Sequence, residues 1–362
     1  FQNTTVLGSG TITALGYYQV MGNVNCSAVL AGNVPLTASG GGANTLSAAN
    51  TYTGATTNNA GALSVAILAD GGQPSGIGAS SSAAENFFSD NATLQYTGGT
   101  TNMDRNFTIK STAIMTLDVS NALTRLTLYG ASAATYGGLI KSGAGTLVLG
   151  GNNLHMGPTA VSQGVLQIGD GGAAGSVASA TLTNNARLVF NRSNDLVVAG
   201  SIGGTGRVVQ AGAGTLFLNG VNTCRGSTIV SNGTLAGAGV IAGVVTNYAT
   251  ITAGAGAEQL GTLTTSNLTL KAGCTALFEL GPTNSCDKIV TPGPLTIEPG
   301  AGIGFSGKSR AGIHRLIACS PAPAIENLLI GQKPDGVKVV LSYDGSHVVA
   351  TVTLEGTVIG VR

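Results

Sequence analysis

The sequence has no tryptophan and is poor in two broader residue classes. Aromatic residues make up 4% and charged residues 9% of its 362 residues, whereas charged residues fill about a quarter of an average globular domain. No run of about 18 apolar residues occurs, so we expect no membrane-spanning helix. The formal net charge is +1 and no basic patch stands out, which argues against a nucleic-acid partner.

Cysteine is also scarce, and its spacing excludes a zinc site. The five cysteines are Cys26, Cys224, Cys274, Cys286 and Cys319, and none lies in a C-x-x-C pair. Cys274 and Cys286 are close enough in sequence to bridge adjacent strands as a disulfide. We expect the others to be small buried apolar residues.

Glycine and β-forming residues dominate what is present. The chain has 57 glycines, 43% hydrophobic residues and a mean hydropathy of +0.32, which is too apolar for a disordered chain. Threonine and valine favour strands, while asparagine, serine and glycine favour turns. The composition therefore predicts an all-β fold, and the low net charge gives little repulsion against self-association.

An internal repeat carries the strongest structural signal. Residues 146–166 read TLVLGGNNLHMGPTAVSQGVL, and residues 215–235 read TLFLNGVNTCRGSTIVSNGTL. The two copies match without a gap, from Leu147 with Leu216 to Leu166 with Leu235. A looser copy around residues 45–63 keeps Asn50, Tyr52 and Gly54.

The repeat predicts a β-solenoid. Alternating apolar residues form short strands, and Gly-Asn clusters turn the chain between them. A coil of about 20 residues is too short for a βαβ unit and falls in the solenoid range; repeated through most of the chain, it gives roughly 15 to 18 coils. We expect a parallel β-helix through at least 140–240. The residues predicted to point inward are Leu147, Leu149, Val161, Leu166, Leu216, Leu218, Val230 and Leu235.

On these residues the chain resembles the autotransporter-associated β-strand repeat family, also called the passenger-associated transport repeat family. Residues 143–166 and 212–235 follow its pattern, except that His155 and Cys224 replace the usual tyrosine. Residues 237–261 resemble the stretch that usually follows the last repeat. The resemblance covers about 40–355 and implies a right-handed parallel β-helix, exported from a bacterium as an adhesive or structural surface rod.

The two ends prompt further expectations. Because the sequence begins at Phe1, we expect a mature, secreted chain whose signal peptide has been removed; a fragment of a longer chain is the alternative. Members of the family often end in a translocating barrel or a sorting helix, whereas residues 353–362 are strand-like, so we expect the anchor to be removed, absent or replaced by assembly with other copies. We divide the chain into an N-terminal cap (1–40), solenoid repeats (41–255) and a C-terminal strand-rich segment that continues the solenoid (256–362).

Several motifs are interpreted as chance matches. Residues 302–309 fit both the P-loop and, in part, the G-x-G-x-x-G pattern, but the residues that follow make a poor helix; we expect a strand–turn–strand corner that binds no nucleotide. His155, His314 and His347 lie too far apart to suggest metal or acid–base chemistry, and we expect His155 in the turn of its repeat. The Asn-x-Ser/Thr sites are Asn3, Asn25, Asn91, Asn106, Asn191, Asn232 and Asn267.

Three functions remain open at this point. The first is a non-catalytic structural subunit of a bacterial extracellular filament or surface layer, assembling with its own copies through strand edges near 1–30 and 335–362. The second is an adhesin or passenger rod that binds a host or glycan surface. The third is a carbohydrate-active enzyme, for which Asp170 and Asp195, about one coil apart, could meet on one face. We predict no catalytic, cofactor-binding or metal-binding residues and no cofactor.

Overall fold

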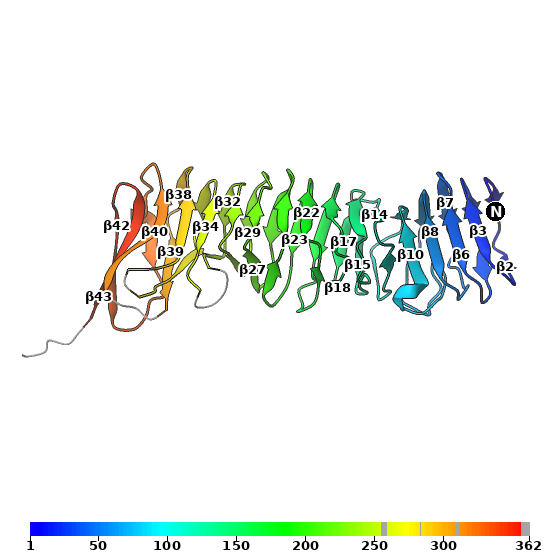
Figure 1. The fold of residues 1–362 in the computed structure, drawn as a ribbon, viewed down its shortest axis with the longest axis horizontal. Helices are drawn as coiled ribbons and strands as arrows, with labels where there is room; N and C mark the ends of the chain where they lie inside the picture. Colours follow the sequence, from blue (N-terminus) through cyan, green and yellow to red (C-terminus); the bar gives the residue numbers. More distant parts are fainter. Residues whose placement is uncertain (255–258, 283, 308–310, 356–362) are drawn as a thin grey trace, which may run out of the picture. The chain divides into compact units, whose positions relative to one another are not determined.

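The computed structural model describes residues 1–254, 259–282, 284–307 and 311–355. The chain divides into two compact units, Phe1–Arg192 and Ser193–Arg362, and Figure 1 shows both as stacks of short strands. The fold is a parallel β-solenoid of about 13 turns. The all-β solenoid predicted from the sequence is confirmed, whereas the three-segment division stays a prediction.

Unit 1 winds short strands around an apolar interior. One of its sheets runs, in spatial order, through β1 (Thr5–Val6), β4 (Asn25–Cys26), β7 (Ala43–Leu46), β9 (Ala62–Val65), β11 (Thr93–Tyr96), β14 (Ile114–Val119), β16 (Gly138–Ser142), β19 (Thr159–Val161) and β22 (Thr181–Asn184). A second contains β3 (Tyr18–Met21), β6 (Leu36–Ser39), β8 (Thr56–Asn59), β10 (Phe87–Asp90) and β13 (Thr108–Ile109). A third contains β12 (Thr101–Met103), β15 (Arg125–Leu128), β17 (Thr146–Leu149), β20 (Val165–Ile168) and β23 (Arg187–Phe190). Two smaller pairs join β2 (Thr11–Thr13) to β5 (Val29–Ala31), and β18 (Asn152–Asn153) to β21 (Ser176–Val177).

In unit 2 the strands other than β25 (Ser201–Gly203) also fall into three sets. The first contains β24 (Leu196–Val198), β27 (Thr215–Leu218), β30 (Thr234–Ala236), β33 (Thr250–Thr252), β36 (Thr275–Glu279), β39 (Ala301–Ser306) and β41 (Leu328–Ile330). The second contains β26 (Arg207–Gln210), β29 (Thr228–Val230), β32 (Val245–Asn247), β35 (Leu268–Leu270) and β38 (Leu295–Ile297). The third contains β28 (Val221–Asn222), β31 (Val240–Ile241), β34 (Thr262–Thr265), β37 (Lys288–Thr291), β40 (Gly312–Cys319), β43 (His347–Leu354) and β42 (Val337–Tyr343).

Parallel register aligns the apolar residues into columns. Leu126 pairs with Leu147, Leu147 with Leu166, and Leu166 with Leu188, and all four side chains are fully buried. The eight residues predicted to point inward are all buried, so that prediction is confirmed. Because no single coil can bury its own apolar face, stacking supplies the hydrophobic stabilisation of the fold.

The asparagine of each repeat fastens the coils to one another. Asn153 accepts a hydrogen bond from the Ser132 amide at 3.0 Å, and its Nδ2 donates to the carbonyl of Gly151 at 2.9 Å. Asn222 is placed alike, accepting from the Ile202 amide at 3.0 Å and donating to Gly220 and Val240. Both asparagines are buried. These side chains satisfy backbone groups at a corner where the strand ladder is interrupted.

Two departures from a regular coil explain why there are about 13 turns rather than the 15 to 18 expected from a uniform period. In unit 1 a long segment, residues 66–83, lies between β9 and β10 and contains no strand. In unit 2 the last strands are antiparallel, because β43 pairs in that sense with both β40 and β42. The described helices are single 3-10 turns, η1 (Ala84–Asn86) and η2 (Ile325–Asn327), and no helix of the described residues has the length and apolar character needed to cross a membrane.

The last described strands of unit 2 form an antiparallel hairpin, although the sequence analysis expected residues 256–362 to continue the solenoid. Asp344, Gly345 and Ser346 connect β42 to β43, with Gly345 at a φ of 96°. The Asp344 carboxylate accepts the backbone N–H groups of Ser346 and His347 at 3.0 and 2.8 Å. An Asp-Gly turn between two alternating apolar runs favours a hairpin, so the chain folds back on itself here instead of winding a further parallel coil.

Candidate functional site

A groove lies on the outer face of unit 1. It lies over β8, β10 and β13, which are neighbours in one sheet. Side chains alternate between the interior and the outside along each strand. Thr56, Asn58 and Phe87 are buried, so Thr57, Asn59 and Phe88 face outward.

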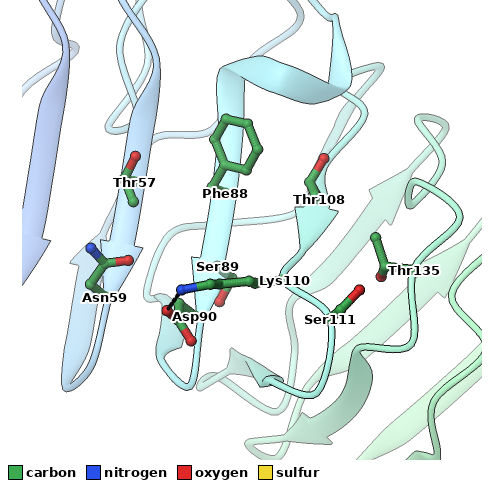
Figure 2. Close-up of a pocket in the computed structure, with 9 residues that line it drawn as sticks. All are labelled: Thr57, Asn59, Phe88, Ser89, Asp90, Thr108, Lys110, Ser111 and Thr135. Atoms are coloured by element: carbon green, nitrogen blue, oxygen red, sulfur yellow. Dashed lines mark hydrogen bonds and ion pairs between the residues drawn. The ribbon is translucent and has the colours of Figure 1, made fainter.

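The strand register arranges the outward side chains in two rows, as Figure 2 shows. Thr57, Phe88 and Thr108 are register partners and form the first row. Asn59 pairs with Asp90 in the second row, where the Nζ of Lys110 lies 2.7 Å from the Asp90 carboxylate. Because neighbouring strands are about 4.8 Å apart, each row of three extends over roughly 10 Å.

Turn residues complete the groove and give it the size of a small-molecule site. Ser111 follows β13, and Thr135 lies in the turn before β16. The groove has a volume of about 400 Å³, within the range of roughly 300–1,000 Å³ found for ligand pockets. Phe88 supplies an aromatic ring among hydroxyl, amide and paired charged groups.

A second groove lies on the outside of unit 2, over β27, β30, β33 and β36, with a volume of about 790 Å³. Phe217 and Thr215 line it on β27, and three acidic residues also border it: Asp195, Glu279 and Asp287. Asp287 is buried, and its two carboxylate oxygens accept the backbone N–H groups of Gly261 and Glu279 at 3.0 and 3.1 Å. Burial raises the pKa of Asp287 to about 6. Its hydrogen bonds join β36 to the segment before β34, which is a structural role.

The described part of the P-loop match is a strand. Residues 302–306 belong to β39, and the side chains of Ile303 and Phe305 are fully buried. The amide N–H of Gly302 donates to the carbonyl of Cys274 at 2.8 Å, and that of Phe305 to Gln332 at 2.8 Å. Lys308 and Ser309 lie outside the described residues. The next described element is strand β40; the turn of the expected strand–turn–strand corner lies outside the described residues, and the absence of nucleotide binding stays a prediction.

His155 lies between β18 and β19, in the turn of its repeat as expected, and its side chain is part of the core. It is fully buried, with Nδ1 at 2.8 Å from the Ser132 hydroxyl and Nε2 at 2.9 Å from the Thr159 hydroxyl. Tyr52 occupies the same place in the early repeat, where its hydroxyl lies 2.7 Å from that of Thr56. In both repeats the side chain therefore bonds to the threonine four residues onward. The family's tyrosine position is an interior corner.

Burial of His155 predicts a loss of stability in acid. Burial lowers its pKa from an ordinary 6.5 to about 4, so between these values the unfolded chain binds the proton that the folded chain excludes. Lowering the pH from 7 to 4 should therefore destabilise the surrounding coils by roughly 3 kcal/mol. Amide hydrogen exchange over residues 139–168, corrected for its intrinsic pH dependence, measures this loss. The variant His155→Tyr has no such titration; equal pH dependence in both proteins would contradict the prediction.

The other titratable candidates have separate structural partners. Asp170, in unit 1, pairs with Arg125 and accepts a hydrogen bond from the Tyr129 hydroxyl at 2.9 Å. Asp195, in unit 2, accepts the amide N–H of Thr215 at 3.3 Å. His314 is buried with Nδ1 at 3.2 Å from the Ser285 carbonyl oxygen, and His347 lies 3.6 Å from Asp344. No group of three or more possible metal ligands occurs among the described residues.

The structure decides between the two fates considered for the cysteines, a bridge between Cys274 and Cys286 or burial as free thiols. All five cysteines are buried and free, so Cys274 and Cys286 do not form a disulfide. Cys274 precedes β36 and Cys286 precedes β37, strands that belong to different sheets. The two cysteines are close in sequence, but they do not lie on neighbouring strands of one sheet.

Comparison with known proteins identifies the repeats. The family model described as "Passenger-associated-transport-repeat" matches residues 36–65, 139–168 and 208–236. The "Adhesin BmaC autotransporter" of Brucella suis biovar 1 (strain 1330) is 37% identical to this chain over 227 aligned residues, which cover 53% of this chain and 6% of the relative. The chain thus spans a small part of that protein's length. Three segments of this solenoid therefore match the passenger-associated transport repeat, and part of the chain is homologous to part of an autotransporter adhesin.

Proposed function

We propose that this chain is an adhesive passenger segment that works outside the bacterial cell or on its surface and binds a host or glycan-bearing surface. The observation that carries the proposal is the 37% identity with part of an adhesin, together with three passenger-associated transport repeats in this chain. Support also comes from the fold, since a stack of coils presents long side faces while its core stays closed. The grooves over β8, β10 and β13 and over β27 to β36 lie on such faces.

The proposal assigns the chain no catalytic role. Several of its acidic side chains are engaged in structural contacts: Asp90 with Lys110, Glu298 with Lys271, Asp344 with Arg315, and Asp287 with backbone N–H groups. A glycosidase needs two carboxyl groups facing one substrate bond. Release of new reducing ends from polysaccharides by the purified chain would contradict this part of the proposal.

Surface display tests the adhesive function. The chain is exported on the surface of a non-adherent laboratory bacterium, with the same carrier lacking the chain as control. We expect attachment to cultured epithelial cells to rise about tenfold, because many copies act together on one surface. Removal of cell-surface glycans by glycosidases distinguishes a glycan target from a protein target. Attachment equal to that of the empty carrier would refute the proposal.

Assembly with other copies of the chain, which the sequence favoured as the leading function, is retained only as a lesser proposal. Neither the repeats nor the adhesin relative supports a filament. Near the C-terminal end of unit 2, β42 pairs antiparallel with β43 and is the last described strand of its sheet. Exposed Leu7, Leu15 and Tyr17 in the first coil are the surface that favours association; light scattering that shows a monomer at high concentration would exclude it.

A further inference from the structure

We propose that the groove over β8, β10 and β13 binds a single neutral pyranose residue, with the sugar ring lying on the face of Phe88. The inference deepens the adhesive function proposed above, because it names the chemical class of ligand and the residues that hold it. The repeat pattern specifies the inward leucines and the corner asparagines, and it does not specify the residues that line this groove.

The first argument is the aromatic ring. Phe88 is partly exposed between Thr57 and Thr108, its register partners on the two neighbouring strands, and Figure 2 shows the ring standing on the outer face of the sheet. The face of an aromatic ring carries partial negative charge. The C–H groups on one face of a pyranose carry partial positive charge and are apolar enough to displace water from the ring. An aromatic platform with polar neighbours therefore suits a sugar better than a wholly apolar ligand.

The second argument is the set of polar groups around Phe88. Within the described part of the chain, the hydroxyls of Thr57 and Ser111 and the amide of Asn59 form no hydrogen bond with another residue. The Thr135 hydroxyl accepts the amide N–H of Gly137 at 3.3 Å, which leaves its own O–H to donate. Together these groups combine donors and acceptors, as a ligand with several hydroxyl groups requires. A pocket with one apolar surface and a few convergent polar groups fixes both the position and the orientation of such a ligand.

The third argument is charge. Asp90 and Lys110 form an ion pair at 2.7 Å, so the charged residues of the groove neutralise one another. A neutral ligand is favoured over an anionic or cationic one because neither side chain is left to balance an extra charge. Lys110 has further N–H donors beyond the one directed at Asp90, and these remain for a sugar oxygen.

A peptide is a poorer occupant of this surface. Peptides that add to sheets do so along an open strand edge, through backbone hydrogen bonds. Here β10 is paired on both sides, with β8 and with β13, so its backbone groups are used within the sheet. The ligand must be recognised by side chains from above, and those side chains offer hydroxyl, amide and aromatic groups.

Ligand-observed NMR on the purified full-length chain tests the proposal. The probes are the methyl pyranosides of glucose, galactose, mannose and N-acetylglucosamine, with N-acetylneuraminic acid as an anionic sugar and a short Ser/Gly peptide as a non-sugar. We expect saturation transfer to at least one neutral pyranoside with a Kd on the order of 1 mM. Phe88→Ala should weaken binding at least tenfold, whereas Phe88→Trp should retain it.

The matched control is Phe217→Ala, which removes an outward aromatic residue from a strand of the other groove. Loss of binding in this variant, with binding kept in Phe88→Ala, would move the site to unit 2 and overturn the proposal. Saturable binding of only the anionic sugar or only the peptide would overturn the assignment of a neutral pyranose, as would no binding by any probe at about ten times the expected Kd. The NMR measurement uses the purified chain and the attachment assay uses displayed chains, so either result can be negative while the other is positive. The two proposals can therefore fail separately.

Discussion

Substitution of Gly226 by alanine is expected to disrupt the coils around this residue in unit 2. A Cβ at this position would lie 1.9 Å from the carbonyl oxygen of Gly206 and 2.4 Å from its carbonyl carbon. These are backbone atoms of the adjacent coil, so the clash is relieved only by separating coils that are held at strand spacing. We expect a loss of roughly 3–5 kcal/mol, which is large for a single methyl group and comparable to severe overpacking.

Gly203→Ala is the matched control for this substitution. Gly203 lies in the same unit, and the nearest atom to its added Cβ is the Thr223 hydroxyl at 3.4 Å. Thermal unfolding followed by circular dichroism, together with limited proteolysis to locate the opened coils, measures both variants. A destabilisation of about 1 kcal/mol lowers the melting temperature by several degrees. Melting temperatures of Gly226→Ala and Gly203→Ala that agree within about a degree would therefore contradict the prediction.

Substitution of Arg105 by alanine is expected to release residues 66–83 from the side of unit 1. The guanidinium of Arg105 is buried and donates to the carbonyls of Ala69, Asp70, Gln73 and Gly78 and to the Ser80 hydroxyl, at 2.9 to 3.1 Å. One side chain thus satisfies acceptors along a segment that has no strand of its own. Its loss leaves buried carbonyls unpaired, and we expect roughly 3–5 kcal/mol of local destabilisation.

Thermolysin digestion with mass spectrometry locates the released segment. Cleavage within residues 66–83 should become much faster in Arg105→Ala, and Arg105→Lys should fall between it and the native chain, because an ammonium has three donors in place of five. Arg187→Ala serves as control, since Arg187 is an exposed arginine of the same unit on β23. Equal cleavage in the Arg105 and Arg187 variants would mean that other contacts hold the segment.

The regular part of the fold could be predicted from local patterns. Alternation in 146–149 and 215–218 placed the leucines inward, and the equal spacing from Leu147 to Leu166 and from Leu216 to Leu235 set the coil length. The hairpin at the end of unit 2 was equally readable, because Asp344-Gly345 separates two alternating apolar runs. The resemblance to a solenoid led to the expectation of a parallel coil there, although the turn chemistry favoured reversal.

The candidate groove was not predicted, although part of its signal was present. Phe87 and Phe88 are adjacent in a strand, and adjacent residues face opposite sides, so one of the two rings had to lie outside. Which polar residues would surround that ring depended on the pairing of β8, β10 and β13, whose sequence separations differ because of the segment 66–83. The coil length read from the repeats was therefore not enough to predict that Lys110 lies beside Asp90. The role of Arg105 was also missed. Most of its acceptors are backbone carbonyls, which every residue has, so the sequence does not indicate which of them it will bind.

The segment that Arg105 holds also indicates how such a protein can change length. Within a strand, one inserted residue would turn every following side chain from the core to the surface. A whole coil can be added because each coil meets only its neighbours, and a loop can be added at a corner when a side chain anchors it, as in residues 66–83. Viable insertions and deletions in this chain should therefore cluster at about 20 residues, or at corners, and be rare at one or two residues inside strands.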